Sequence, residues 1–369
     1  MLQVDAERDL TPTQIKNRLE VWSHGLRTKG FSPEATSLIV GSHKKSSQHQ
    51  YQSGWKQWLN YLNQENITDR DICIATVCNF LAKKFFLEER ALNTIKNYYY
   101  AIRDPLKFLY KLDIYTCSEI SQLFAGAFQL RPPKKAIELW PCWDINDLLS
   151  YLCSSVFEPL ERAPWEKIMI KTIILILINT GRRMCEIAFL TIDFQTPSSN
   201  VVILNWIAGF LAKAQREFLD WTPKLPQIVA SPIPHDLLCP VRAFRIYHKL
   251  RLAKGRDAYN GMLWSASKIN LSYLVIGTVK NAIRLAHPGI PNKDVPKVGC
   301  HHFRKLAISY SWKYFKGTLD SLCDRVGTKS TATLLKHYIR DVPGIKVPLQ
   351  VPLGCLMPNT RVCHPLSNK

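Results

Sequence analysis

Three short segments of this chain combine residue types that suit the cleavage of a phosphodiester. TGRRMCEI at 180–187 contains an arginine followed three residues later by a glutamate, HHFRK at 301–305 contains a His-x-x-Arg box, and LLKHYIRD at 334–341 contains a tyrosine. A guanidinium is permanently charged and can donate two parallel hydrogen bonds to a phosphate. Tyrosine can act as a covalent nucleophile, and histidine exchanges protons near neutral pH. The three segments therefore predict attack of a tyrosine on a phosphate held by arginines.

The His-x-x-Arg box has a simple geometric consequence if its segment is helical. His301 and Arg304 then share one face, because residues three apart are neighbours on a helix, so both can converge on one phosphate. His302 would point roughly 100° away from that face. Taken alone, such a pair is common by chance, and a tyrosine is more often a core residue than a nucleophile.

The ordered set of segments resembles the catalytic signature of the tyrosine recombinases, the phage-integrase superfamily, over most of residues 45–342. The resemblance implies that Arg304 is a phosphate clamp, that His301 transfers or shares a proton, and that Tyr338 is the nucleophile. Tyr338 lies 34 residues after Arg304, which is close to the spacing of the family. The finer resemblance of several segments is to recombinases of eukaryotic DIRS-like and Crypton-type mobile elements.

The family pattern also selects one of two adjacent arginines. Arg183 matches the first clamp arginine, because its spacing from Gly181 and to Glu186 fits the family better than that of Arg182. We expect Glu186 to orient Arg183 or a neighbouring histidine rather than to contact the substrate. In isolation, the same residues would be an ordinary arginine and glutamate at the start of a surface helix.

A lysine on a hairpin loop completes the family set as general acid. Lys213 in FLAKAQRE is the best match, and Lys224 is the alternative. One position departs from the pattern: Thr328 stands where the family usually has histidine or tryptophan after a glycine. Threonine can still donate one hydrogen bond to a phosphate oxygen, and Lys329 is a candidate to compensate.

Composition indicates a folded protein with a polyanionic partner. The chain has 369 residues, 46% of them hydrophobic, and 49 Lys+Arg against 29 Asp+Glu give a formal charge of +20. Such a surplus favours nucleic acid. The polar N-terminus does not resemble a secretory signal, and no apolar run approaches the ~20 residues of a membrane span. Eleven cysteines without a CxxC pair predict reduced thiols rather than disulfides, and Cys300-His301-His302 lacks the spacing of a zinc site.

Apolar periodicity predicts a mainly α protein of two domains. Helical stripes cover 47–62, 77–85, 92–109 and 118–129, and RPPKK at 131–135 then breaks the pattern. The predicted order is a polar lead-in with one short helix near 12–22 (1–45), a helical DNA-binding domain of the core-binding kind (46–130), a linker (131–143), a catalytic domain (144–342) and a Pro-rich tail (343–369).

The catalytic domain is predicted to be mixed α+β but mostly helical, with a small antiparallel sheet. Alternation predicts a strand at 201–206 with a hairpin partner at 216–221. Helices are expected at 145–154, 240–250, 271–286, 302–315 and 331–339. Residues 165–179 could be a helix or a buried strand by periodicity alone, and the family resemblance favours a helix.

The resulting hypothesis is a site-specific recombinase or integrase that works through a 3′-phosphotyrosyl intermediate without metal or cofactor. Its partners would be double-stranded DNA and further copies of itself, as a tetramer by family resemblance, in the nucleus of a eukaryote or otherwise in the cytoplasm. Two alternatives remain: a domesticated, non-catalytic DNA-binding protein and a type IB topoisomerase-like enzyme. Further candidate DNA contacts are Lys96, Arg103, Lys305 and Lys329.

Overall fold

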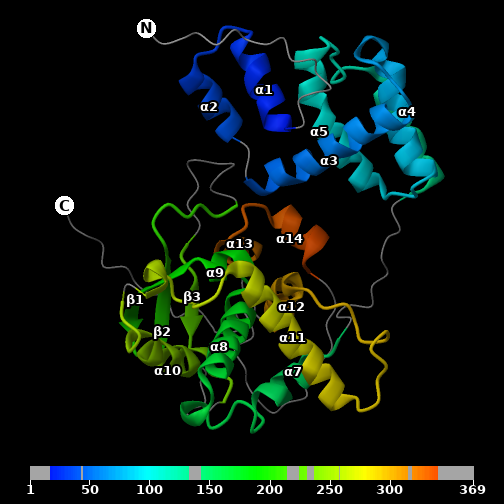
Figure 1. The fold of residues 1–369 in the computed structure, drawn as a ribbon. Coiled ribbons are helices and arrows are strands. Elements are labelled where there is room, and N and C mark those ends of the chain that lie inside the picture. The colour runs from blue at the N-terminus through cyan, green and yellow to red at the C-terminus, as the bar shows by residue number, and fades with distance from the viewer. Residues whose placement is uncertain are drawn as a thin grey trace. The chain divides into compact units, whose positions relative to one another are not determined.

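The computed structural model describes residues 17–42, 45–132, 143–213, 224–230, 237–256, 258–314 and 318–339. Contacts divide the chain into two compact units, Met1–Ala136 and Ile137–Lys369. Within the described ranges, the structure is mostly helical with a three-stranded antiparallel sheet (Figure 1), so the predicted fold class is confirmed. None of the described helices is long and apolar enough to cross a membrane.

The first unit is a helical bundle built on the predicted apolar stripes. Trp55 and Trp58 of one helix, Phe80 of the next and Ile102 of a third are completely buried together. Edge-on packing of the Trp58 and Phe80 rings, with centroids 5.2 Å apart, is a favourable aromatic geometry. The described helices of the unit are α1 (Arg18–Arg27), α2 (Pro33–Gly41), α3 (Lys45–Gln64), α4 (Ile74–Phe86), α5 (Leu92–Leu109) and α6 (Ser118–Leu130).

In the described part of the predicted lead-in over 1–45, the structure differs from the expectation of one short helix near 12–22. The chain forms two helices there, and α1 lies several residues later than expected. Val21 of α1 belongs to the core of the first unit, and the buried Arg18 pairs with Asp104 at 2.9 Å and donates to the carbonyl of Ala101. The helix also buries Val21, Trp22 and Leu26, and its first residues overlap the helix expected near 12–22.

The predicted linker lies largely outside the described residues, and the Pro-rich tail lies entirely outside them. The segment 216–221, predicted as a hairpin partner, is also outside them.

The second unit packs its helices around α8 (Trp165–Thr180), which contacts α10, α11 and α12 (Figure 1). Residues 168–180 of α8 are all buried, so this helix is apolar on every side, as a central helix must be. The ambiguity between helix and strand is thus resolved in favour of a helix. The other helices are α7 (Ile145–Leu152), α9 (Met184–Ala188), α10 (Pro240–Leu252), α11 (Lys268–Ala286), α12 (Cys300–Tyr314), α13 (Leu319–Val326) and α14 (Thr331–His337).

The sheet of the second unit has the order β1-β2-β3, with all neighbours antiparallel. The predicted strand is confirmed as β2 (Val201–Trp206). Its described partners are β1 (Leu190–Ser198) and β3 (Gln227–Val229), which the sequence pattern did not identify.

A close helix contact offers a test of the packing in the first unit. Gly54 of α3 is buried, and a Cβ there would lie 2.6 Å from Cβ of Ala101 on α5. We expect Gly54→Ala to lower the free energy of unfolding by about 1–3 kcal/mol through overpacking. Gly126→Ala in α6 is the matched control, because nothing lies within 4 Å of its Cβ. Urea unfolding of the full chain measures both, and a Gly54→Ala protein as stable as the control would refute the contact.

Candidate active site

A left-handed turn at the end of α8 presents the two adjacent arginines. Gly181 has φ +61°, a conformation that glycine adopts without the Cβ penalty, and its amide donates to the carbonyl of Leu177 at 3.0 Å. The chain then reverses, and Arg183 becomes the N-cap of α9. This turn separates the two arginine side chains into different surroundings.

Arg183 lies at the surface of the site. Its side chain is 21% exposed, and Nη1 donates to Oε1 of Glu186 at 2.8 Å and to the carbonyl of Gly327 at 3.4 Å. Burial lowers the pKa of Arg183, but the charge and the hydrogen bond of Glu186, together with the nearby Tyr338 and Cys185, raise that pKa above its ordinary value. Glu186 itself is only 1% exposed. A carboxylate placed in this way orients the guanidinium and has no access to a bound polyanion.

Arg182 is in the opposite situation, because its side chain is 1% exposed. Its Nη2 donates to the carbonyl of Lys224, and Nη1 lies 3.6 Å from Oε2 of Glu186. The guanidinium also lies over the Trp206 ring, 5.7 Å from its centre. Arg182 therefore belongs to the interior, and Arg183 is the arginine that faces outward.

Arg304 is completely buried on α12, and one nitrogen of its guanidinium, Nη1, is held by backbone carbonyls. Nη1 donates to the carbonyls of Gly181 and Val326, at 2.7 and 2.6 Å. Nε and Nη2 have no carbonyl or carboxylate partner among the described residues, and the side chain of Tyr338 is the hydrogen-bonding group beside this guanidinium. Burial, and then repulsion from Arg183, lowers the pKa of Arg304 to about 10, so the side chain remains charged at neutral pH.

Tyr338 lies directly against this second arginine. It caps the C-terminal end of α14, is 6% exposed, and its carbonyl accepts a hydrogen bond of 2.7 Å from the Ser309 hydroxyl. Cζ of Arg304 is 5.0 Å from the centre of the Tyr338 ring, and the His301 ring centroid is 5.3 Å from it. The fold thus brings together a tyrosine, a histidine and two arginines from three separate segments of the sequence.

The two histidines of the box have different surroundings. His301 is exposed beside Tyr338, whereas Nδ1 of His302 accepts a hydrogen bond of 3.2 Å from the Trp143 indole. Loss of hydration on the side of the His301 ring that faces the site, followed by repulsion from Arg304, Lys305 and Arg183, lowers its pKa to about 4. The imidazole is therefore neutral at pH 7 and can accept a proton.

Thr328 follows the turn that ends α13. Gly327 at the turn has φ +64°, and the amide of Thr328 donates to the carbonyl of Cys323 at 3.0 Å. The Thr328 side chain is buried, and its neighbour Lys329 is exposed. The position that departs from the family pattern is therefore part of the same turn that contacts Arg183.

The two candidate lysines differ in their links to the site. Lys213 is exposed after β2, and it forms no hydrogen bond or ion pair with another described residue. Lys224 precedes β3, its carbonyl accepts from Arg182, and its Nζ is 2.8 Å from Oδ2 of Asp324 on α13. Only the second lysine is thus connected to the turn of the site by described contacts.

The candidate DNA contacts of the first unit are half-buried and engaged with neighbours. Nζ of Lys96 lies 5.9 Å from the centre of the Phe124 ring. Arg103 lies 3.9 Å from the centre of the Tyr115 ring and 3.4 Å from Asp104. Both remain on the face predicted to be polar, and DNA binding by either is still a prediction.

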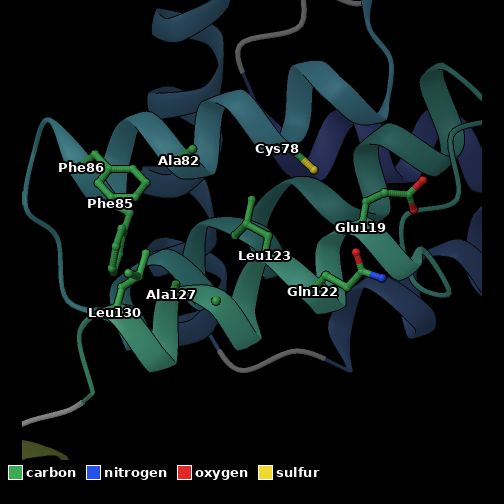
Figure 2. Close-up of a pocket in the computed structure, with 10 residues that line it drawn as sticks. Cys78, Ala82, Phe85, Phe86, Glu119, Gln122, Leu123, Ala127 and Leu130 are labelled. Carbon is green, nitrogen blue, oxygen red and sulfur yellow. The ribbon is translucent and has the colours of Figure 1, made fainter.

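A separate pocket of about 440 Å³ lies between α4 and α6 in the first unit (Figure 2). Phe85, Phe86 and Leu130 gather at one end of it, and Glu119 and Gln122 lie at the other. Its lining is mostly apolar and contains no cation that would hold a phosphate. It is therefore not the site predicted from the sequence.

Sequence reasoning did not foresee the backbone groups that position the arginines. The carbonyls of Gly181, Val326 and Gly327 accept hydrogen bonds from Arg304 and Arg183. A signal for one of them is present in the sequence, because a glycine directly after an amphipathic segment is typical of a helix C-terminus.

Comparison of the sequence with protein-family models and with curated proteins gives no match. Among solved structures, the fold is similar to the XerH site-specific recombinase bound to its difH substrate in a pre-cleavage complex. The TM-score is 0.52 at 15% identity, covering 88% of this chain and 94% of that one. A post-cleavage complex of XerH with a palindromic difH substrate gives a TM-score of 0.51 at 15% identity, with 88% and 93% covered. The fold is therefore that of the site-specific tyrosine recombinases.

The surroundings of His301 give a testable pH dependence. We expect its imidazole to titrate near pH 4 in the free protein, measured by NMR with His301→Gln to assign the resonance. In the unfolded chain the pKa is about 6.5. The contribution of this residue to stability is therefore present above pH ~6.5 and is lost as the pH falls towards 4. A His301 pKa at or above 6.5 would contradict the arrangement of cations around the ring.

Proposed function

We propose that this protein is a site-specific DNA recombinase or integrase that cuts and rejoins DNA through a 3′-phosphotyrosyl intermediate. The observation that carries the proposal is the guanidinium of Arg304, which is buried beside Arg183 and whose Nε and Nη2 have no acceptor among the described residues other than the nearby Tyr338 hydroxyl. Leaving buried donors unsatisfied costs about 1–3 kcal/mol. A phosphate is the ligand that satisfies such an edge in bidentate fashion.

The charge of the site fits a phosphodiester and its transition state. Arg183 presents an exposed edge and Arg304 a buried one, so the two can contact different non-bridging oxygens. Glu186 is turned inward toward the arginines and does not oppose the bound anion. Preorganised positive charge of this kind is usually the largest single term in catalysis.

In the proposed reaction the Tyr338 oxygen attacks the scissile phosphorus. The phenolic proton passes to the neutral His301, a phosphorus–oxygen bond to the tyrosine forms, and the bond to the 5′ oxygen breaks. Lys213 gives its proton to the departing 5′ oxygen, with Lys224 as the alternative donor. Attack by a 5′ hydroxyl from another strand reverses the step. The phosphotyrosyl bond conserves the energy of the phosphodiester, so the chemistry requires no nucleotide cofactor and no metal.

Tyr338 must move before this reaction. In the structure its ring centre lies 5.0 Å from Cζ of Arg304, its side chain is the hydrogen-bonding group beside that guanidinium, and Nε and Nη2 of Arg304 are inaccessible to solvent. A phosphate reaches that edge only when the ring swings away, and the same movement brings the hydroxyl into line with the phosphorus.

The proposed partner is double-stranded DNA, bound by copies of the protein that assemble as a tetramer. The formal charge of +20 supports phosphate contacts, which position a protein on DNA without specifying sequence. Candidate contacts are Lys96, Arg103, Lys305 and Lys329. We further propose an origin in a DIRS-like or Crypton-type mobile element and location in a eukaryotic nucleus, on the strength of the segments at 210–217, 237–250 and 334–341.

Replacement of the nucleophile and the clamps tests the reaction. Incubation with a suicide duplex carrying the target site should give a covalent protein–DNA adduct that Tyr338→Phe abolishes, because phenylalanine has no attacking oxygen. Arg183→Ala and Arg304→Ala should each slow adduct formation by about 10²–10³-fold. His302→Gln is the matched control, since that ring bonds to Trp143.

The outcomes separate the candidate functions. An adduct mapped to another tyrosine would remove Tyr338 from its role. Salt-sensitive DNA binding without any adduct would instead indicate the non-catalytic DNA-binding protein, because phosphate contacts release counterions whether or not chemistry follows. Relaxation of supercoiled DNA by the monomer would indicate the topoisomerase-like alternative.

A modified leaving group identifies the general acid. A sulfur in place of the 5′ bridging oxygen departs as a thiolate, and a thiol with pKa of about 8.5 needs no proton donor. The true donor should therefore show a large loss on substitution with alanine when the leaving atom is oxygen and little loss when it is sulfur. We expect this pattern for Lys213→Ala. The same pattern for Lys224→Ala would transfer the role to Lys224, whose carbonyl already contacts Arg182.

A further inference from the structure

We propose that Arg182 is a positioning residue of the active site. It holds the turn at the end of α13, whose carbonyls accept hydrogen bonds from both proposed phosphate-binding arginines. The role rests on the proposed function, because it concerns the geometry of the same reaction. Arg182 does not contact DNA in this proposal, since its side chain is only 1% exposed.

The first observation is that Arg182 links three segments that are distant in the sequence. From the turn after α8, its Nη2 donates to the carbonyl of Lys224, just before β3. Its guanidinium also packs against Gly327, at the end of α13. A rigid planar group with donors in a fixed fork suits such a junction better than a flexible ammonium does.

The second observation is the closeness of the contact with Gly327. A Cβ built on that residue would lie 2.0 Å from Nη1 and 2.9 Å from Cζ of Arg182. Glycine is thus required here twice: by its φ of +64° and by the space that the guanidinium occupies. The backbone at the turn is therefore in direct van der Waals contact with the guanidinium of Arg182.

The third observation connects this turn to the phosphate clamps. The carbonyl of Gly327 accepts from Arg183, and the carbonyl of Val326 accepts from Arg304. A displacement of the turn would therefore move both guanidiniums, although Arg182 touches neither of the hydrogen bonds. A misplacement of about 1 Å can cost about 10²-fold in rate.

Arg182 also shares the charge of the buried Glu186. The carboxylate lies 2.8 Å from Nη1 of Arg183 and 3.6 Å from Nη1 of Arg182. With two cations beside it, the carboxylate does not neutralise Arg183 alone. Arg182 therefore supports the site electrostatically as well as sterically.

A buried arginine could instead contribute only to folding, and Arg251 provides the matched control. It is also completely buried, and it donates to the carbonyls of Gly255, Ala258 and Met262, none of which contacts the candidate site. Arg182→Met and Arg251→Met thus remove the same kind of side chain from the interior of the same unit. Only the first change alters the support of Gly327.

The experiment compares the two variants in the full-length protein, at a temperature where thermal unfolding shows both to be folded. Single-turnover adduct formation on saturating suicide duplex should be about 10²-fold slower for Arg182→Met. The rate for Arg251→Met should equal that of the unmodified protein. The affinity for the same duplex, measured in the Tyr338→Phe background, should not change for either variant. Equal rates for the two variants, or a loss of affinity that accounts for the slower reaction, would overturn the proposal.

A double-mutant cycle tests the contact without requiring activity. Gly327→Ala should lower the unfolding midpoint less in an Arg182→Ser background than in the unmodified protein, since the backbone strain is common to both and only the clash is relieved. Equal decreases would refute the contact and with it the positioning role. An unmodified protein that forms no adduct, yet shows the coupling, would count against the proposed function and not against the role of Arg182 at the turn.

Discussion

Three guanidiniums converge on the C-terminal end of α13, and the geometry of the candidate site depends on that convergence. The last carbonyls of a helix lack partners within the helix and carry its partial negative charge, so cations are favoured there. Arg304 and Arg183 donate hydrogen bonds to the carbonyls of Val326 and Gly327, and Arg182 packs against the turn itself. One short helix end thus sets the spacing between the proposed phosphate-binding groups, which come from distant parts of the sequence.

The same region also contains the proposed nucleophile, which is held by fewer buried contacts than the arginines are. Tyr338 belongs to a small apolar cluster with Ile308, Val326 and Leu334, separate from the main core of the unit. Leu334 is the buried residue of α14, whereas α8 is buried along almost its whole length. Segments with few buried apolar contacts open at low free-energy cost. Arg304 is held by two backbone carbonyls, whereas Tyr338 caps a short helix with few buried residues, an arrangement that suits the movement proposed for Tyr338.

Residue types and spacing selected four residues that the structure brings together, but they did not indicate what positions those residues. Arg183, His301, Arg304 and Tyr338 were chosen from the sequence, and the structure brings them together. The outward orientation of Arg183 and the inward one of Arg182 follow from a turn and from backbone acceptors, which leave no side-chain pattern. Long helices with apolar stripes were predictable because a periodic pattern needs many partly buried residues. The strands β1 and β3 do not supply such a pattern. The short β3 offers too few residues for a periodic signal, and most of β1 is exposed.

The departure at Thr328 has a limited consequence because of where it falls. The clamps bond to the backbone of the two preceding residues, and the amide of Thr328 is fixed by the carbonyl of Cys323. The backbone of the turn is therefore held by hydrogen bonds of its main-chain groups. In the proposed site, threonine in place of the larger residue of the family pattern would change a single donor to the phosphate, a change worth about 10²–10³-fold in rate when the donor is lost entirely. Because both arginines keep their supports, the departure alone does not dismantle the site.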